Sequence, residues 1–78
     1  MNKFLDFTGE VLECNSKDKE ELVLDYLNSY DSLYFASPLE GNALSLVGGV
    51  QVKDKDKFIL DFVEFLENNG MYFLGYWE

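Results

Sequence analysis

The sequence contains one segment twice, and this repeat constrains the fold more than any other feature. KDKEELVLDYL at Lys17–Leu27 aligns without a gap to KDKDKFILDFV at Lys53–Val63. The flanking segments also pair between the two copies: Leu5–Glu13 with Leu44–Val52, and Leu33–Phe35 with Met71–Phe73. A chain built from two similar halves is expected to fold as two similar units.

The segments on either side of each repeated core have the pattern of β-strands. In residues 3–8, Leu5 and Phe7 alternate with Asp6 and Thr8, which predicts a half-buried strand. Gly9 interrupts this strand, and Gly48-Gly49 interrupts its counterpart at residues 43–52, so we expect a bulge or bend at both places. Residues 33–36 and 71–77 complete the set of strands. Pro38 cannot donate a backbone hydrogen bond, so the strand at residues 33–36 should end there or lie at a sheet edge.

The repeated cores themselves have the pattern of amphipathic helices. Asn15 and Ser16 are good N-cap residues, and carboxylates follow in the first turn of a helix expected over residues 17–30. Its apolar residues recur at helical spacing: Leu22, Val23, Tyr26, Leu27 and Tyr30. The second helix is expected to start at Asp54 and to stop at Asn68-Asn69-Gly70. Its buried face should hold Phe58, Ile59, Phe62, Val63, Phe65 and Leu66.

The resulting order, βαββαβ, predicts an α+β fold of the ferredoxin-like type. Two βαβ units joined by a hairpin make a four-stranded antiparallel sheet with both helices on one face. The repeat agrees with the internal pseudo-two-fold symmetry of that fold, with halves at about residues 3–38 and 43–77. We expect residues 1–78 to form a single domain, because the chain is near the size at which one core is just sufficient. The fold hosts many unrelated functions and does not assign one.

Composition excludes several classes of function. The chain contains no His, and all six of its basic residues are Lys, so imidazole-based triads, imidazole metal sites and arginine phosphate clamps are absent. That absence argues against the acylphosphatase-type enzymes of this fold, and we expect no enzyme activity and no cofactor. The net charge of −9 repels nucleic acid and anionic membranes, which leaves a basic protein as the favoured partner.

Cys14 is the single cysteine, and it excludes an intrachain disulfide. With no apolar leader at the N-terminus and no run of about 20 apolar residues, we expect a soluble, cytoplasmic protein. The helix dipole and nearby Lys17 could lower the thiol pKa of Cys14, but a plain reduced cysteine is the favoured reading because no base accompanies it. Asp54 and Asp56 alternate as in a calcium loop, yet lysines lie between them and a helix follows, so no metal site is expected.

The sequence predicts that the charges divide the molecule into two parts. We expect the two central strands to run parallel, so that Lys17–Lys19 and Lys53–Lys57 lie together at one end of the sheet. The rest of the surface would then be strongly acidic, either to keep an aromatic-rich protein soluble or to occupy a basic groove.

The open face of the sheet is a second candidate surface. We expect Leu33, Phe35, Met71 and Phe73 to point towards the helices and Tyr34, Tyr72, Leu74 and Tyr76 to point away. Aromatic side chains on this face resemble the base-stacking surface of RNA-recognition motifs, but these strands lack the basic residues that phosphate requires. Exposed tyrosines suit a protein interface instead, while amphipathic packing is the alternative.

These features together predict a small acidic binding protein that inhibits a basic, nucleic-acid-binding partner by occupying its positive surface. In size, charge and compactness the chain resembles phage- or plasmid-encoded inhibitors, including anti-CRISPR proteins that imitate DNA. Carboxylates would replace phosphates, and binding would weaken as salt rises. The alternatives are an immunity protein against a nuclease toxin, or a regulatory module that binds a small ligand as a homodimer through the open sheet face. The candidate contact residues are Asp25, Asp31, Glu40, Asp61, Glu64, Glu67, Glu78, Tyr34, Tyr72 and Tyr76.

Overall fold

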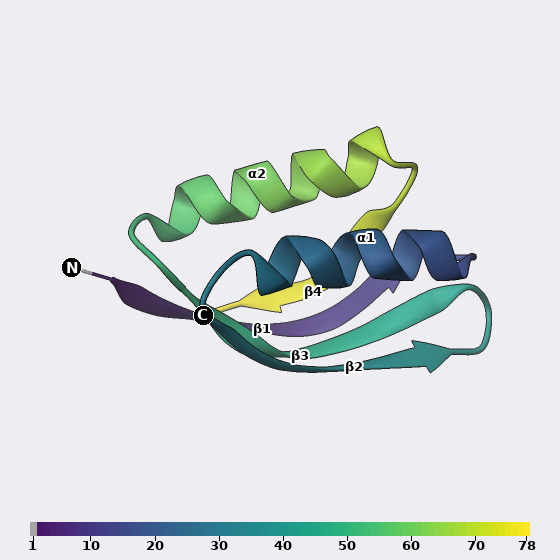
Figure 1. Cartoon of the computed structure of the whole chain (residues 1–78), viewed down its shortest axis with the longest axis horizontal. Helices are drawn as coiled ribbons and strands as arrows, with labels where there is room; N and C mark the ends of the chain where they lie inside the picture. Colours follow the sequence, from purple (N-terminus) through teal and green to yellow (C-terminus); the bar gives the residue numbers. More distant parts are fainter. Residues whose placement is uncertain (1) are drawn as a thin grey trace.

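The computed structural model describes residues 2–78 and has the predicted order of elements (Figure 1). They are β1 (Lys3–Leu12), α1 (Lys17–Asn28), β2 (Ser32–Leu39), β3 (Ala43–Val52), α2 (Lys55–Asn68) and β4 (Tyr72–Trp77). The four strands form one antiparallel sheet in the order β2-β3-β1-β4. This topology confirms the ferredoxin-like α+β prediction.

Both helices begin at a capping side chain. The Ser16 hydroxyl accepts a hydrogen bond from the backbone N–H of Lys19, and the Asp54 carboxylate accepts one from that of Lys57. Each bond satisfies a backbone donor that the first turn of a helix leaves unpaired. After α2, Gly70 has a φ of 73°, in the left-handed region that its lack of a side chain permits. The capping residues and Gly70 were therefore sufficient to predict where both helices begin and where α2 ends.

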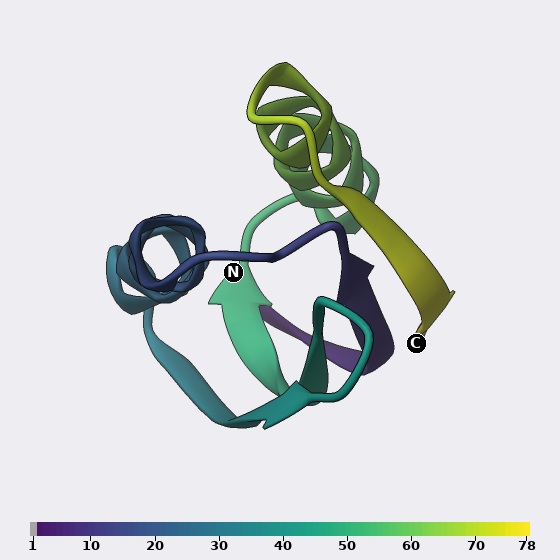
Figure 2. The same cartoon turned by 90° about the vertical axis from the view of Figure 1, so that its right-hand side faces the viewer.

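The core lies between the sheet and the two helices, which share one side of the curved sheet (Figure 2). The inward positions of β1 and β3 supply Leu5, Val11, Leu46 and Val50, all almost fully buried. The helices contribute fully buried side chains of their own: Val23 and Leu27 from α1, and Phe58, Phe62 and Leu66 from α2. Among residues 2–78 no polar or charged side chain is buried, so apolar burial dominates the stability of this fold.

Of the bulge or bend predicted at Gly9, the bulge is wrong, because β1 pairs with β3 residue by residue across this position. Gly9 is instead required by the approach of β4. It lies opposite Gly75, and a Cβ on Gly9 would lie 2.5 Å from the Leu74 carbonyl oxygen and 2.8 Å from the Phe73 ring. The two glycines together make room for Phe73 over the inner side of the sheet. Gly48 and Gly49 also keep one-to-one pairing, so no bulge occurs in β3 either.

The strand β2 is longer than predicted and includes Pro38. It is an edge strand, with β3 as its one hydrogen-bonded neighbour. An edge tolerates a residue without a backbone N–H, which is the second of the two outcomes that the sequence predicted for Pro38.

The predicted clustering of lysines at one end is wrong, because β1 and β3 run antiparallel. Leu12 lies opposite Ala43, and Lys3 lies opposite Val52. The segments that follow Leu12 and Val52, which hold five of the six lysines, therefore lie at opposite ends of the sheet. The lysines of the two repeated segments therefore do not share one mixed-charge end.

Candidate protein-binding surface

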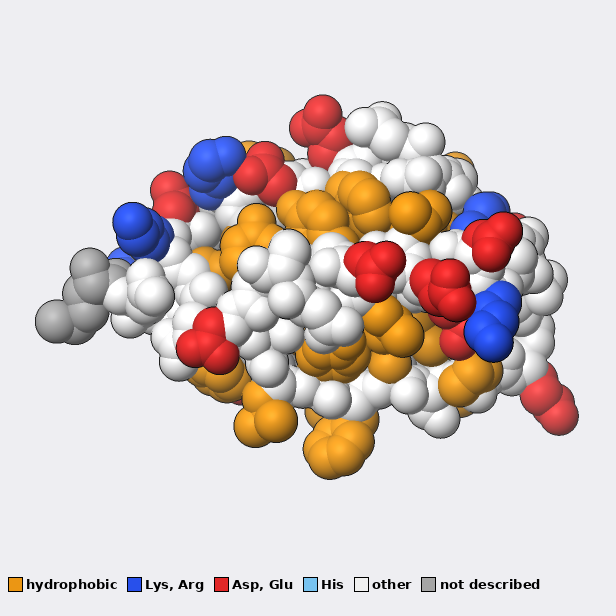
Figure 3. Space-filling model, viewed as in Figure 1, with side chains coloured by type: hydrophobic (Ala, Val, Ile, Leu, Met, Phe, Trp, Pro, Cys, Tyr) orange, Lys and Arg blue, Asp and Glu red, His pale blue; other side chains and the backbone are white. Residues whose placement is uncertain are grey.

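The side of the sheet that faces away from the helices exposes many large apolar side chains. We call this surface the open face. Its eight large apolar residues are Phe4, Leu33, Phe35, Leu39, Val47, Tyr72, Leu74 and Tyr76. Phe35 is 81% exposed and Leu33 is 75% exposed, which is unusual for side chains of this size. Figure 3 shows hydrophobic side chains standing out from the lower side of the molecule, where Figure 1 places the sheet.

The predicted orientation of β2 is wrong, because Leu33 and Phe35 belong to the open face and Tyr34 points towards the helices. The Tyr34 hydroxyl donates a hydrogen bond of 2.8 Å to Oδ1 of Asn28, at the end of α1. Tyr34 pairs with Gly48, and a Cβ on Gly48 would lie 2.4 Å from the Tyr34 Cα, so the glycine lets β2 lie close to β3 at this point. Tyr34 thus lies apart from the open face.

The predicted orientation of β4 is confirmed. Tyr72, Leu74 and Tyr76 lie on the open face, with exposures of 53%, 63% and 62%. Met71 is fully buried, and Phe73 packs against the core. Two of the three candidate tyrosines are therefore on one surface.

The strand β1 places a line of polar side chains through the middle of the open face. Asp6, Thr8 and Glu10 alternate outwards, and β1 lies between β3 and β4 in the sheet. Asp6 and Glu10 are the only carboxylates within the four strands, and the only lysine within them, Lys3, lies opposite the buried Val52. The open face thus has two apolar stripes separated by an acidic line on β1, with Phe4 at one end of that line.

The other candidate carboxylates do not form one surface. On the helices, Asp25, Glu64 and Glu67 are exposed, and Asp61 is partly buried. Three more are exposed in connecting or terminal positions, at opposite ends of strands: Asp31, Glu40 and Glu78. No single flat partner can contact all seven. They contribute to a negative electrostatic potential around the molecule and do not form a continuous acidic patch.

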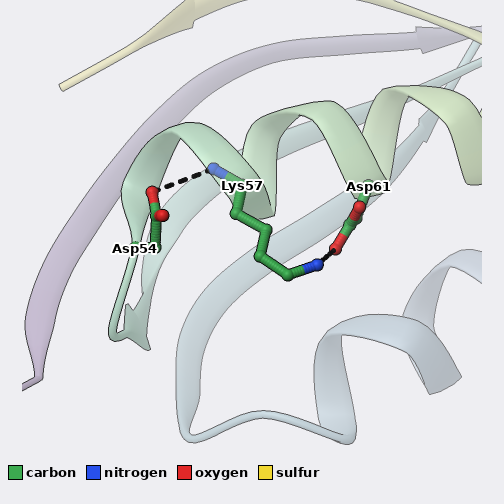
Figure 4. A network of polar contacts seen from close by, with 3 residues as sticks. All are labelled: Asp54, Lys57 and Asp61. Atoms are coloured by element: carbon green, nitrogen blue, oxygen red, sulfur yellow. Dashed lines mark hydrogen bonds and ion pairs between the residues drawn. The ribbon is translucent and has the colours of Figure 1, made fainter.

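The pair Lys57–Asp61 is the only ion pair within 4 Å among residues 2–78 (Figure 4). The two side chains lie one helical turn apart, with Nζ 2.8 Å from Oδ2, and their hydrogen bond raises the pKa of Lys57. Two other lysines bond to backbone carbonyls, Lys19 to Glu13 and Lys55 to Glu78. Nearly all of the 15 carboxylates therefore have no lysine within 4 Å among residues 2–78.

A groove of about 490 Å³ lies beside the start of α2. Its walls include Tyr30, Lys53, Lys57, Phe58 and Asp61. Charges of both signs line it, so it selects no obvious ligand class. Within residues 2–78, no three His, Cys, Asp or Glu side chains converge as metal ligands would.

Cys14 lies beside a smaller hollow at the other end of the sheet and is buried. Burial raises its thiol pKa, nearby Glu20 adds to this increase, and Lys19 opposes it. The suggested lowering of the pKa by the helix terminus and Lys17 is therefore wrong. A buried, protonated thiol is a structural residue rather than a nucleophile.

Comparisons with known protein families, with curated proteins and with solved structures gave no match to this chain. Along the described residues, neither helix combines the length and apolar composition needed to cross a membrane.

Sequence reasoning missed the most exposed residues of the open face, Leu33 and Phe35, and its two carboxylates, Asp6 and Glu10. A signal for the carboxylates was present: Leu5 and Phe7 were correctly assigned to the core, so Asp6 had to face outwards. The segment Leu33–Phe35 offered no such signal, since three consecutive apolar residues fit either orientation.

Proposed function

We propose that the protein is a small acidic inhibitor that covers the positive surface of a nucleic-acid-binding protein. The observation that supports this proposal most directly is the surplus of unneutralised carboxylates. The chain has a net charge of −9, and residues 2–78 contain a single ion pair. Such a molecule attracts basic surfaces and repels nucleic acid itself.

The protein acts by binding and not by catalysis. Its carboxylates occupy the lysines and arginines that would otherwise hold phosphates, and they displace the anions bound there. The open face supplies apolar contact area, which charge alone does not provide. Inhibition is therefore stoichiometric: one copy of the protein blocks one basic site.

Affinity capture at two salt concentrations tests this function. Tagged protein is incubated with a lysate of its native host at about 50 mM salt, and the bound fraction is washed at about 500 mM salt. We expect a basic, nucleic-acid-binding protein in the high-salt eluate. The purified partner should then lose its labelled DNA or RNA as the acidic protein is added, with an end point near equimolar.

A double variant, Glu64→Gln with Glu67→Gln, tests the contribution of charge. It removes two negative charges from side chains that are exposed on α2. We expect it to fold normally and to bind more weakly, with a smaller salt dependence. If the partner is a toxic nuclease, a protein that covers its basic surface in this way is an immunity protein. Binding that is equally strong at both salt concentrations, or a partner that keeps its nucleic acid, would contradict the proposal.

A further inference from the structure

The open face is large enough to be an interface. Fully covered aromatic side chains bury about 150–250 Å² each, so its four aromatic residues, at 41–81% exposure, leave on the order of 500 Å² accessible. Leu33, Leu39, Val47 and Leu74 bring the apolar area close to the roughly 800 Å² that each partner contributes to a standard interface. Most monomers keep their largest apolar patch below about 600 Å².

The arrangement of apolar and acidic side chains on the open face indicates which kind of partner can bind there. The stripe on β2 and β3 contains Leu33, Phe35 and Val47, with Phe35 and Val47 directly paired. The stripe on β4 contains Tyr72, Leu74 and Tyr76. Between them, Asp6 and Glu10 face outwards from β1 without a lysine partner. A partner that covers both stripes must bring cations to these two carboxylates, since burying unpaired charge is costly.

A second copy of the chain is a poor occupant by the same argument. It would place a second pair of uncompensated carboxylates in the contact, and each copy carries a net charge of −9. Covering the apolar stripes in this way would desolvate like charges without any compensating cation.

We propose that the open face is the docking surface for a basic partner protein, which presents Lys or Arg flanked by apolar side chains. This inference rests on the proposed function, because it names the surface through which the inhibitor binds. The apolar stripes cover the partner's apolar side chains, and Asp6 and Glu10 pair with its central cations. The carboxylates on the helices attract the partner but do not contact it.

Three synthetic peptides of equal length test the surface without a known partner. The first is an amphipathic Leu–Lys peptide, the second has Ser in place of Leu, and the third has Glu in place of Lys. Backbone amide shifts of isotope-labelled protein locate the binding site. We expect the Leu–Lys peptide to shift amides of β1, β2 and β4 at the open face, and the two other peptides to bind at least about tenfold more weakly.

Variants at exposed positions separate the contribution of the apolar stripes from that of Asp6 and Glu10. Phe35→Ser with Tyr76→Ser should lower the affinity for the Leu–Lys peptide at least about tenfold, and Asp6→Asn with Glu10→Gln about fivefold. The matched control is Leu60→Ser, because Leu60 is 69% exposed but lies on α2. It should leave the affinity unchanged.

Three results would overturn the docking surface: no binding of the Leu–Lys peptide, shifts confined to the helices, or a homodimer that Phe35→Ser dissociates in sedimentation experiments. The test also separates this surface from the proposed function. If wild-type protein captures a basic partner and the Phe35→Ser, Tyr76→Ser variant captures it equally well, only the docking surface fails. If wild-type protein captures no basic partner while the peptide results hold, only the inhibitory function fails.

Discussion

Tyr26 of α1 stacks on Phe65 of α2, with ring centroids 4.5 Å apart and 29° between the ring planes. The Tyr26 ring also lies 5.3 Å from that of Phe62 and 6.2 Å from that of Phe58. Aromatic pairs in such arrangements add about 0.5–1.5 kcal/mol to the effect of area burial. Tyr26 of α1 therefore packs against three aromatic side chains of α2.

Replacement of Tyr26 by Ala should lower the free energy of unfolding by about 2–4 kcal/mol, because it removes this stack and leaves a cavity between the helices. Urea denaturation followed by circular dichroism measures the change. Leu60→Ala on α2 is the control, since its exposed side chain should alter the stability by less than about 0.5 kcal/mol. Equal effects of the two substitutions would show that the stack does not hold the helices together.

The same residue makes stability sensitive to alkaline pH. Burial raises the pKa of the Tyr26 hydroxyl to about 12, with further increases from nearby Tyr30 and Asp61. A pKa raised on folding favours the folded state as long as the unfolded phenol stays protonated, up to its ordinary pKa of about 10. That contribution is lost as the pH rises from about 10 through 12.

We therefore expect the stability of the wild-type protein to fall between pH 10 and 12 relative to that of the Tyr26→Phe variant, which has no hydroxyl at this position. Denaturation curves of both proteins at several pH values in this window measure the difference. Parallel pH profiles would mean that Tyr26 ionises alike in the folded and unfolded states.

Gly75 has no room for a side chain, because β1 lies directly against it. A Cβ there would lie 2.3 Å from the Thr8 carbonyl oxygen and 2.6 Å from the Gly9 Cα, both of which are backbone atoms. Gly75→Ala must displace β4 from β1, and we expect a loss of about 1–3 kcal/mol in unfolding free energy. Ser37→Ala on the exposed edge strand β2 is the comparison, with an expected change below about 0.5 kcal/mol. A tolerated Gly75→Ala would show that β4 can move without loss of packing.

Cys14 should be a poor nucleophile in the folded protein. Its burial and its raised pKa both reduce the fraction of reactive thiolate. We expect a thiol-specific reagent at pH 8 to modify native protein at least about tenfold more slowly than protein unfolded in urea. Similar rates in both states would indicate an accessible thiol and would reopen a chemical role for this residue.

The elements of this fold were predictable because their signals are local. A hydroxyl at Ser16 and a carboxylate at Asp54 cap the helices, and Gly70 ends the second one, through interactions within a few residues. The repeated pattern then supplied the order of elements. Helix α1 still ends two residues earlier than its apolar stripe suggested, because Ser29 caps it and its hydroxyl bonds to the Tyr26 carbonyl.

The features that could not be predicted from the sequence are those that depend on contacts between different strands of the sheet. Gly9 interrupts the pattern of its own strand, but the need for glycine comes from β4, whose backbone at Leu74 and Gly75 and whose Phe73 ring lie against it. The close approach of Tyr34 to β3 depends on the missing side chain at Gly48. The positions of the lysines depend on the relative direction of β1 and β3. Each is a non-local relationship, and these same relationships define the open face.

The position of Trp77 has a practical consequence for following this protein optically. It is the only tryptophan in the chain, and its ring lies 4.7 Å from that of Phe73 and 5.9 Å from those of Phe7 and Phe62. These neighbours come from β1, α2 and β4, so its emission reports whether the last strand is docked on the core. Tyr72 and Tyr76 lie on the opposite side of the same strand. Tryptophan fluorescence thus follows folding from one side of β4, while signals assigned to Tyr72 and Tyr76 follow events on the other.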